Sequence, residues 1–259
     1  MQMTGDRIDK ALIRERFAKA IGTYDREASV QRHIAVQMCE MLGQAATSGT
    51  FSRVLEIGCG TGIYTGLICS IFNPEHLYIN DICPEMEDIA GQASGGKAVF
   101  IHGDAEAIRF PEGLTLITSC SAIQWFYDLR AFFLKCRSSL NDGGMLAFST
   151  FGENNLKEIR QITNAGLNYP GMQEIKTLLG ETGFGILAST EENTEIWFSS
   201  PTEAVRHLKS TGVTATSAKK SWTKKTLESF AEKYSAAFGR EDGKVPLTYH
   251  PIHIIANKN

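Results

Sequence analysis

Three glycines and an acidic residue fall within one short stretch, VLEIGCGTGIYTGL, at residues 54–67. Gly58, Gly60 and Gly62 have the spacing G-x-G-x-G, whereas the turn that cradles a dinucleotide pyrophosphate has G-x-G-x-x-G. Glycine lets the backbone adopt positive φ and approach a ligand closely. Glu56 comes just before the turn, where its carboxylate would repel phosphate but attract a cation. S-adenosylmethionine carries an ammonium and a sulfonium and has no phosphate, so the stretch favours this cofactor over a dinucleotide.

Two more acidic residues follow at the ends of predicted strands. Asp81 ends the second strand, 21 residues after Gly60, where its carboxylate would accept hydrogen bonds from both ribose hydroxyls of either cofactor. Asp104 lies just past the third strand, where it would accept a hydrogen bond from the adenine amino group, with the backbone amide of Ala105 beside it. Ordinary turn and capping acids are the alternative interpretation. The glycine turn and the two acids at successive strand ends together favour S-adenosylmethionine.

The elements that must hold these residues alternate between strand and helix. Five short apolar runs predict strands: RVLEIG, HLYIND, AVFIHGD, LTLITSCS and MLAFSTF. Helices are predicted between them at 61–70 and 85–92, and a third helix begins at Asp128, a capping residue, and carries one apolar stripe. The stripe consists of Leu129, Phe132, Phe133, Cys136 and Leu140. The alternation predicts a doubly wound, Rossmann-like α/β fold with a parallel sheet, and ligands bind such sheets beyond the carboxyl ends of the strands.

The residues outside this pattern predict further helices and two more strands. Helices are expected within 9–42 and at 154–166, 171–182, 201–211 and 223–238, with strands at 186–198 and in VPLTYHPIHIIAN. Because 201–240 interrupts two strands that would otherwise be neighbours, we interpret it as a helical cap over the carboxyl edge of the sheet. The predicted domains are an N-terminal helical lid, a cofactor-binding core, a cap insertion and a last core strand, at 1–50, 51–200, 201–240 and 241–259.

The overall composition excludes several classes of protein. A net charge of −3 over 259 residues gives no field that would recruit nucleic acid or an anionic membrane. No apolar run approaches the roughly 20 residues that a transmembrane helix needs. The charged N-terminus, MQMTGDRIDKALIRERF, lacks the apolar segment of a signal peptide. We therefore expect a cytoplasmic protein with neither a nucleic-acid partner nor a membrane partner.

The cysteines and histidines do not form a pattern typical of a metal site. The six cysteines contain no C-x-x-C and lie in apolar segments, so we expect them to be reduced core residues. His250 and His253 stand three residues apart in a predicted strand, so they would point to opposite faces. We therefore predict no metal.

The glycine turn with its two following acids resembles the core of class I methyltransferases, over roughly residues 50–152. Four outer motifs resemble BioC-type enzymes of biotin synthesis: RFAKAIGTYDREASVQ, SAIQW, AVRHLKSTGVTAT and PLTYH. They extend the resemblance over residues 17–256, with a departure at Val213, where the family often has alanine. The resemblance implies a class I methyltransferase sheet, S-adenosylmethionine as cofactor, and methylation of the free carboxylate of malonyl-acyl carrier protein or malonyl-coenzyme A.

Four further residues are candidates for holding the cofactor and the substrate. We assign Tyr24, in the N-terminal lid, and Ser119, at the end of the fourth predicted strand, to the cofactor. Gln124 and Trp125 lie just past that strand, where substrate and methyl group should meet. Helix packing is the alternative for Tyr24, and core packing is the alternative for Trp125.

Methyl transfer to a carboxylate needs alignment more than acid–base chemistry. A malonyl carboxyl titrates near pH ~4, so it is ionised at neutral pH, and we predict no residue that transfers protons. Arg206 and Lys209 stand three apart on one helix face, and an Arg fork suits a carboxylate. A solvated helix surface is the alternative for this pair. Tyr249 and His250 would face opposite ways along a strand, so at most one reaches a given pocket. Core packing is the alternative for either residue.

The run KKSWTKK places four cations around one aromatic residue: Lys219, Lys220, Lys224 and Lys225 around Trp222. A solvated surface is the ordinary interpretation, although such a patch would also steer a substrate carried by an acidic protein. Two other functions remain open from the residues alone. One is a methyltransferase for another small acid or a quinone-like ring, and the other is a module that binds the cofactor without transferring methyl.

Overall fold

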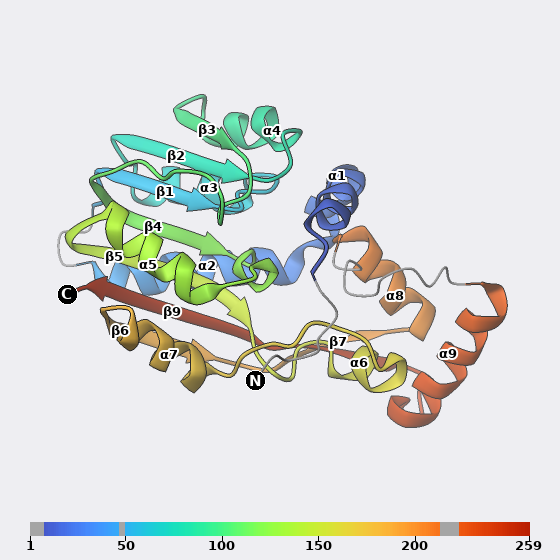
Figure 1. Cartoon of the computed structure of the whole chain (residues 1–259). Helices are drawn as coiled ribbons and strands as arrows, with labels where there is room; N and C mark the ends of the chain where they lie inside the picture. The colour runs from blue at the N-terminus through green and yellow to red at the C-terminus, as the bar shows by residue number, and fades with distance from the viewer. Residues whose placement is uncertain (1–7, 47–49, 213–222) are drawn as a thin grey trace. The chain divides into compact units, whose positions relative to one another are not determined.

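The computed structural model describes residues 8–46, 50–212 and 223–259, which form two compact units (Figure 1). The first, here the sheet unit, consists of Ala28–Thr150, Gly171–Glu191 and Ile252–Asn259. The second, here the helical unit, consists of Met1–Glu27, Phe151–Pro170 and Glu192–Pro251. Each unit is therefore built from segments that are far apart in the sequence.

The sheet unit contains a seven-stranded sheet in the order β3-β2-β1-β4-β5-β9-β6 (Figure 1). The strands are β1 Arg53–Ile57, β2 His76–Asp81, β3 Ala98–His102, β4 Leu114–Cys120, β5 Leu140–Phe151, β6 Phe184–Glu191 and β9 Pro251–Lys258. β1 pairs in parallel with both β2 and β4, so the strand order reverses at β1. β6 and β9 pair antiparallel. The predicted doubly wound sheet is confirmed, and its reversal point is where such folds bind ligands.

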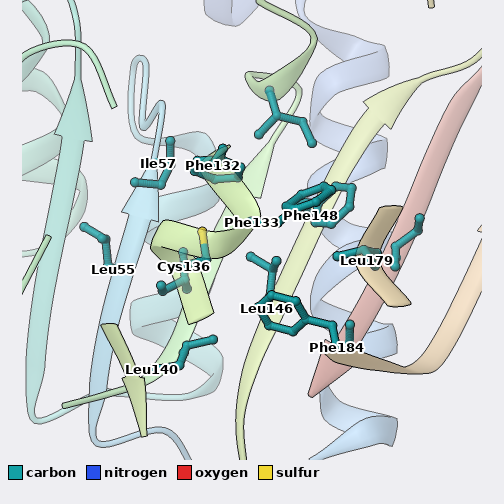
Figure 2. Packing of buried hydrophobic residues seen from close by; sticks show 14 of the residues in the cluster. Leu55, Ile57, Phe132, Phe133, Cys136, Leu140, Leu146, Phe148, Leu179 and Phe184 are labelled. Carbon is teal, nitrogen blue, oxygen red and sulfur yellow. The ribbon is translucent and has the colours of Figure 1, made fainter. Parts of the chain in front are cut away.

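Helices complete the sheet unit: α2 Ser29–Ala45, α3 Ile63–Ile71, α4 Met86–Ala93, α5 Leu129–Ser139 and α7 Met172–Glu181. The predicted cap of α5 is confirmed, because the Asp128 side chain accepts a hydrogen bond from the Ala131 amide at 2.9 Å. Its apolar stripe packs into the core shown in Figure 2, where the rings of Phe133 and Phe148 stack 5.5 Å apart. This core fixes β1 and β4, the strands whose ends carry the predicted site.

The helical unit contains α1 Lys10–Glu27, α6 Lys157–Thr163, α8 Pro201–Ser210 and α9 Lys224–Phe238, with a two-stranded sheet of β7 Thr194–Phe198 and β8 Val245–Tyr249. Phe230 and Tyr234 of α9 pack on Val245, and the Tyr234 hydroxyl donates to the Pro246 carbonyl at 2.7 Å. The two helices predicted within 201–240 are therefore present, and they share a unit with α1, α6 and both strands of the small sheet.

Two strands that the sequence predicted as continuous are each divided, and those predictions are wrong. Residues 186–198 form β6 and β7, and VPLTYHPIHIIAN forms β8 and β9. The main ladder reaches Glu191 opposite Ile252, and the small ladder begins with Thr194 opposite Tyr249. Pro251 has no backbone N–H to continue a ladder. An unbroken apolar run does not reveal that its two halves pair in different sheets.

The two N-terminal helices are present, but they belong to different units. The chain passes from α1 to α2 at Ala28, which is also where the helical unit gives way to the sheet unit. The lid predicted for residues 1–50 is therefore divided at this point. Helical periodicity predicts that each segment is amphipathic, but it does not say which partner covers each apolar face.

Candidate functional site

The three glycines of the turn after β1 have three different surroundings. All have positive φ, at 70° for Gly58, 51° for Gly60 and 85° for Gly62. A Cβ on Gly58 would lie 2.4 Å from the Ala122 Cβ, and one on Gly62 would lie 2.6 Å from the Ala93 Cβ. A Cβ on Gly60 would meet no described atom within 4 Å, apart from its chain neighbours. Gly58 and Gly62 therefore permit close packing, and Gly60 leaves the space in which a ligand could approach the backbone.

Asp81 is tied to this turn by hydrogen bonds. Its Oδ2 accepts from the Gly60 amide at 2.9 Å, and its Oδ1 accepts from the Cys83 amide at 2.8 Å. Burial raises the pKa of this carboxyl, and the amides of Cys83 and Gly60 oppose that shift. The Cys83 side chain and the Ile82 amide also donate to this carboxylate and favour its charged form. The end of β2 thus presents a fixed carboxylate next to the open glycine.

Glu56 lies behind the turn and is only 1% exposed. Its Oε2 accepts a hydrogen bond from the Thr65 hydroxyl of α3 at 2.7 Å. Burial raises the pKa of Glu56 to about 8, the Thr65 hydrogen bond lowers it, and the nearby Asp81 carboxylate raises it further. A cation next to the turn would favour the charged form of Glu56. Because Glu56 is buried, it suits the predicted electrostatic role better than direct contact with a ligand.

The other residues predicted to bind the cofactor already make contacts within the sheet unit. Asp104 Oδ1 accepts from the Glu106 amide at 3.0 Å, as in an ordinary turn. The carbonyl of Ala105, which is itself buried, accepts from Lys135 Nζ at 2.8 Å. The Ser119 hydroxyl donates to the Ile57 carbonyl at 2.9 Å. Ser119 therefore uses its proton to join the ends of β4 and β1, and only its acceptor capacity remains for a ligand.

The motif SAIQW forms a tight turn after β4, with Ile123–Trp125 as a short 3₁₀ helix. The Gln124 amide nitrogen donates to the Ser121 carbonyl at 2.6 Å, and Trp125 is 8% exposed. Since Ala122 packs against Gly58, this turn lies directly beside the glycine turn. The structure thus brings together the ends of β1, β2 and β4, as the sequence predicted.

In the helical unit, the candidate Tyr249 is paired with His207, a residue that was not among the candidates from the sequence. His207 Nε2 lies 2.9 Å from the hydroxyl of Tyr249, and Nδ1 lies 3.8 Å from Glu27 Oε2. Burial lowers the pKa of His207, and Glu27 opposes that shift. The sequence did contain a signal for His207. Adjacent residues on a helix point in different directions, so His207 does not share the helix face of Arg206. The structure places His207 inside and leaves Arg206 and Lys209 exposed.

His250 makes backbone contacts that favour its packing interpretation. Its Nδ1 accepts from the Asn154 amide at 3.2 Å, and its carbonyl accepts from the Gly152 amide at 2.8 Å. The ring therefore organises the turn that follows β5. The prediction that His250 and His253 lie in one strand is wrong, because His250 stands between β8 and β9.

Two other candidates lie in the helical unit. The ring of Tyr24 lies 6.4 Å from that of Phe17 on the same helix, α1. Lys224 and Lys225 are exposed at the start of α9. The other members of that basic run, Lys219, Lys220 and Trp222, lie outside the described residues.

The part of the chain that the structure describes contains no group of three or more His, Cys, Asp or Glu residues arranged to hold a metal ion. The six cysteines all lie within the described ranges as free thiols, and four of them are buried. Within the same described ranges, no helix has the length and apolar character needed to cross a bilayer.

Comparison with known proteins identifies close relatives of this chain. A family model described as a methyltransferase domain matches residues 55–148. A malonyl-[acyl-carrier protein] O-methyltransferase of Bacteroides thetaiotaomicron is 45% identical, covering 97% of this chain and 99% of the relative. A protein of the same name from Haemophilus influenzae is 40% identical, covering 96% and 95%. One from Bacteroides fragilis is 47% identical over 96% of this chain, and the chain spans 50% of that relative.

Solved structures show the same fold at low sequence identity. A putative methyltransferase from Bacillus halodurans has a TM-score of 0.64 at 15% identity, covering 85% of this chain and 98% of that one. The YcgJ protein from Bacillus subtilis has a TM-score of 0.61 at 15% identity, covering 86% and 98%. These likenesses and the domain match confirm the predicted class I methyltransferase fold.

Proposed function

This chain belongs to the malonyl-[acyl-carrier protein] O-methyltransferase family, and on that premise we propose that it methylates the free carboxylate of a malonyl thioester. The methyl donor is S-adenosylmethionine and the product is the malonyl methyl ester. Such an ester masks a charge that the apolar pocket of an elongation enzyme would otherwise exclude. The activity fits a first step in biotin synthesis, as the outer motifs imply.

The observation that best supports this proposal is the Asp81 carboxylate held against the amide of Gly60, next to open space. The adenosine part of the cofactor offers two ribose hydroxyls, which are hydrogen-bond donors that a carboxylate accepts. Its methionine part is cationic at sulfur, and Glu56 lies behind the same turn. The residues present at the ends of β1 and β2 therefore fit the cofactor chemically, and they offer no cation for a pyrophosphate.

When bound, S-adenosylmethionine supplies an electrophilic methyl group, and its transfer to a carboxylate oxygen leaves S-adenosylhomocysteine. Asp81 would hold the ribose, and Gly60 would let the backbone approach the ligand. Glu56 would stabilise positive charge near the turn when it is ionised. Alignment of this kind lowers the barrier through proximity and orientation. The substrate carboxylate is already ionised, so the chain has no proton to remove.

We propose that the substrate carboxylate is recognised by Arg206 with Lys209. Both side chains are exposed on α8 and lie on the same helix face. His207 and Tyr249, by contrast, are buried and bonded to each other. A guanidinium binds a carboxylate through two parallel hydrogen bonds, which selects an acid over a neutral ester. The methylated product would lose this interaction, which favours its release.

The distribution of charge supports a carrier protein as the natural form of the substrate. The helical unit has 17 Lys and Arg against 14 Asp and Glu, a net charge of +3. The sheet unit has 9 against 15, a net charge of −6. An acidic carrier would therefore be attracted to the helical unit, where Arg206 lies. Malonyl-coenzyme A presents the same carboxylate and would be a second substrate.

Mass spectrometry of malonyl-acyl carrier protein after incubation with the enzyme and S-adenosylmethionine tests the proposal. The expected result is one added methyl group on the malonyl-loaded carrier and none on an acetyl-loaded carrier, which lacks the free carboxylate. Methylation of a quinone-like ring or an unrelated small acid in preference to malonyl carrier would contradict the proposed substrate. Binding of the cofactor without any transfer would contradict the proposed reaction.

A further inference from the structure

Lys135 of α5 contacts the loop that follows β3, which carries the two residues predicted to bind adenine. Its Nζ donates to the Ala105 carbonyl at 2.8 Å and lies 4.3 Å from the centre of the Phe110 ring. Ala105 and Phe110 are both buried, so the ammonium lies between a carbonyl oxygen and an aromatic face that is shielded from water. A cation–π contact is stronger in such surroundings. Lys135 therefore joins α5 to two places in the same loop.

A second set of hydrogen bonds joins this loop to the start of α5. The Glu106 carboxylate accepts from the Tyr127 amide at 3.0 Å and from the Asp128 amide at 2.9 Å. Asp128 is the capping residue of α5, so Glu106 binds the backbone that leads into the helix. The loop is thus attached to α5 at its beginning through Glu106 and farther along through Lys135.

Asp104, the residue just before these contacts, depends on them for its orientation. Its carbonyl accepts from the amides of Ala107 and Ile108 at 2.8 Å and 2.9 Å. Its Oδ1 accepts from the Glu106 amide at 3.0 Å. The Asp104 carboxylate is therefore oriented by a turn whose next two residues, Ala105 and Glu106, are held by α5.

Charge also couples Lys135 to the loop. Burial lowers the pKa of Lys135, and the neighbouring carboxylates of Asp104 and Glu106 oppose that shift. The two acids therefore stabilise the ammonium in its half-buried position. Their attraction to Lys135 adds to the hydrogen bond at Ala105 in holding the loop against the helix.

We propose that Lys135 is a positioning residue for recognition of the cofactor's adenine. By holding the Ala105 carbonyl, it sets the Asp104 carboxylate and the Ala105 amide where they meet the base. Lys135 itself does not touch the cofactor, and the assignment rests on the cofactor of the proposed function. A site built to accept a hydrogen bond from an amino group discriminates strongly against an analogue without it. The contribution of Lys135 is therefore selectivity for adenine over a purine that lacks the exocyclic amine.

Calorimetry with two purine ligands tests this role in the full chain. S-adenosylhomocysteine has the exocyclic amine, and S-inosylhomocysteine has a carbonyl oxygen in its place. The wild type should bind S-adenosylhomocysteine about tenfold or more tightly, because only this ligand donates to a carboxylate. Lys135→Met keeps the apolar stem and removes the ammonium. It should reduce the preference to less than about threefold, mainly by weakening S-adenosylhomocysteine. Lys135→Arg retains a cationic donor and should recover much of the preference.

Lys97→Met is the matched control, because it makes the same change at an exposed lysine of the sheet unit. Lys97 precedes β3, at the opposite end of that strand from the loop, and its Nζ donates to the Asn73 side chain at 3.1 Å. This variant should leave both affinities unchanged. Thermal unfolding of the free proteins shows whether each variant is folded. If Lys135→Met does not fold, Lys135→Gln, which is neutral but polar, takes its place.

Three results would overturn the proposal. The first is a wild type that binds both ligands equally, because there would then be no adenine selectivity to position. The second is a folded Lys135→Met that weakens both ligands by the same factor or keeps the full preference, which would leave Lys135 with a structural role alone. The third is a loss of preference in Lys135→Arg as large as that in Lys135→Met, since the cation would then not be what holds the loop.

The outcome is separable from that of the proposed function, because ligand binding requires no methyl transfer. A wild type that prefers S-adenosylhomocysteine and a Lys135→Met that loses this preference would support the role of Lys135, even if malonyl-acyl carrier protein were not methylated. The proposed function alone would then be contradicted. A wild type that methylates the carrier, with the preference unchanged in Lys135→Met, would support the function and overturn the role of Lys135.

Discussion

The hydroxyl of Tyr249 lies 2.9 Å from Nε2 of His207, although 42 residues separate them in the chain. This bond joins AVRHLKSTGVTAT to PLTYH, two of the outer motifs on which the family resemblance rests. On the other side of the imidazole, Glu27 lies 3.8 Å from Nδ1, so the same histidine connects α8 to the last residue of α1. We interpret this buried group as part of what holds the helical unit together.

We expect Tyr249→Phe and His207→Gln each to lower the free energy of unfolding. Tyr249→Phe removes a buried hydrogen bond and leaves His207 Nε2 without its partner, which costs about 1–3 kcal/mol. The double variant should lose less than the sum of the two, because both single changes break the same bond. Urea unfolding of the four proteins measures the coupling. Strict additivity would contradict a direct interaction.

The same histidine predicts a loss of stability in mild acid. Burial lowers the pKa of His207 below its ordinary value of 6.5, so the folded state favours the neutral ring. The contribution is therefore fully present above pH 6.5 and is lost as the pH falls through the lower, folded-state pKa. In His207→Gln, the unfolding midpoint should depend less on pH between about pH 7 and 5 than it does in the wild type. An equally steep profile in the variant would assign the acid loss to other groups.

Glu56 predicts the opposite trend, a loss of stability as the pH rises from mildly acidic values. Its pKa is raised from 4.5 to about 8, so the folded state holds a proton that the unfolded state has already lost between these values. Stability should therefore fall as the pH rises from 4.5 through 8, by about 1.4 kcal/mol per unit of pKa shift at most. Glu56→Gln keeps an acceptor for the Thr65 hydroxyl and should remove this slope. Urea unfolding midpoints at pH 5, 6.5 and 8 measure it, and a slope retained by Glu56→Gln would contradict the assignment.

Much of the sheet unit could be predicted because its signals are local. HLYIND was expected as a strand and is β2, His76–Asp81, and Asp128 was expected as a cap and is one. A change of period or a capping side chain is visible within a few residues. The meeting of Gly60 and Asp81 was also predictable, because neighbouring parallel strands end at the same edge.

The helical unit could be predicted less well because it depends on contacts between distant segments. Nothing local in VPLTYHPIHIIAN shows that β8 pairs with β7 while β9 pairs with β6. The hydrogen bond between His207 and Tyr249 could not be predicted for the same reason, because the sequence around each residue does not indicate its partner. Contacts between distant segments decide such features, and local sequence patterns do not show which segments pair.

Asp81→Asn should weaken cofactor binding while keeping the protein folded. The carboxylate is expected to accept from the ribose hydroxyls, and a hydrogen bond to a charged group contributes about 1.5–3 kcal/mol. Asn retains an acceptor oxygen but replaces the other oxygen with a donor, which would oppose the Gly60 or Cys83 amide. Calorimetry with S-adenosylhomocysteine measures the loss, and thermal unfolding of the free protein separates it from damage to the turn. Unchanged affinity would contradict the ribose assignment.

The two groups of exposed cations in the helical unit should have different kinetic effects. Arg206→Ala should raise the KM for malonyl thioester about tenfold or more, whether the thioester is on coenzyme A or on the carrier, because it removes a charged hydrogen bond to the acid itself. Arg206→Lys should recover only part of the loss, since an ammonium lacks the planar fork. Lys233→Ala, an exposed cation of α9, is the matched control and should leave the KM unchanged. Cofactor affinity should hardly change in any of these variants.

Replacing Lys224 and Lys225 together with alanine should instead slow only the capture of the carrier-bound substrate. These side chains are exposed at the start of α9, where they would act by long-range attraction to an acidic partner rather than by contact with the malonyl group. The defect should therefore shrink as ionic strength rises, because exposed charges are screened beyond about 10 Å at 0.1 M salt. Activity on malonyl-coenzyme A should stay close to wild type at every salt concentration. Steady-state kinetics on both substrates at two ionic strengths would decide between the two roles, and an equal loss on both substrates would mean that the lysines contact the thioester common to them.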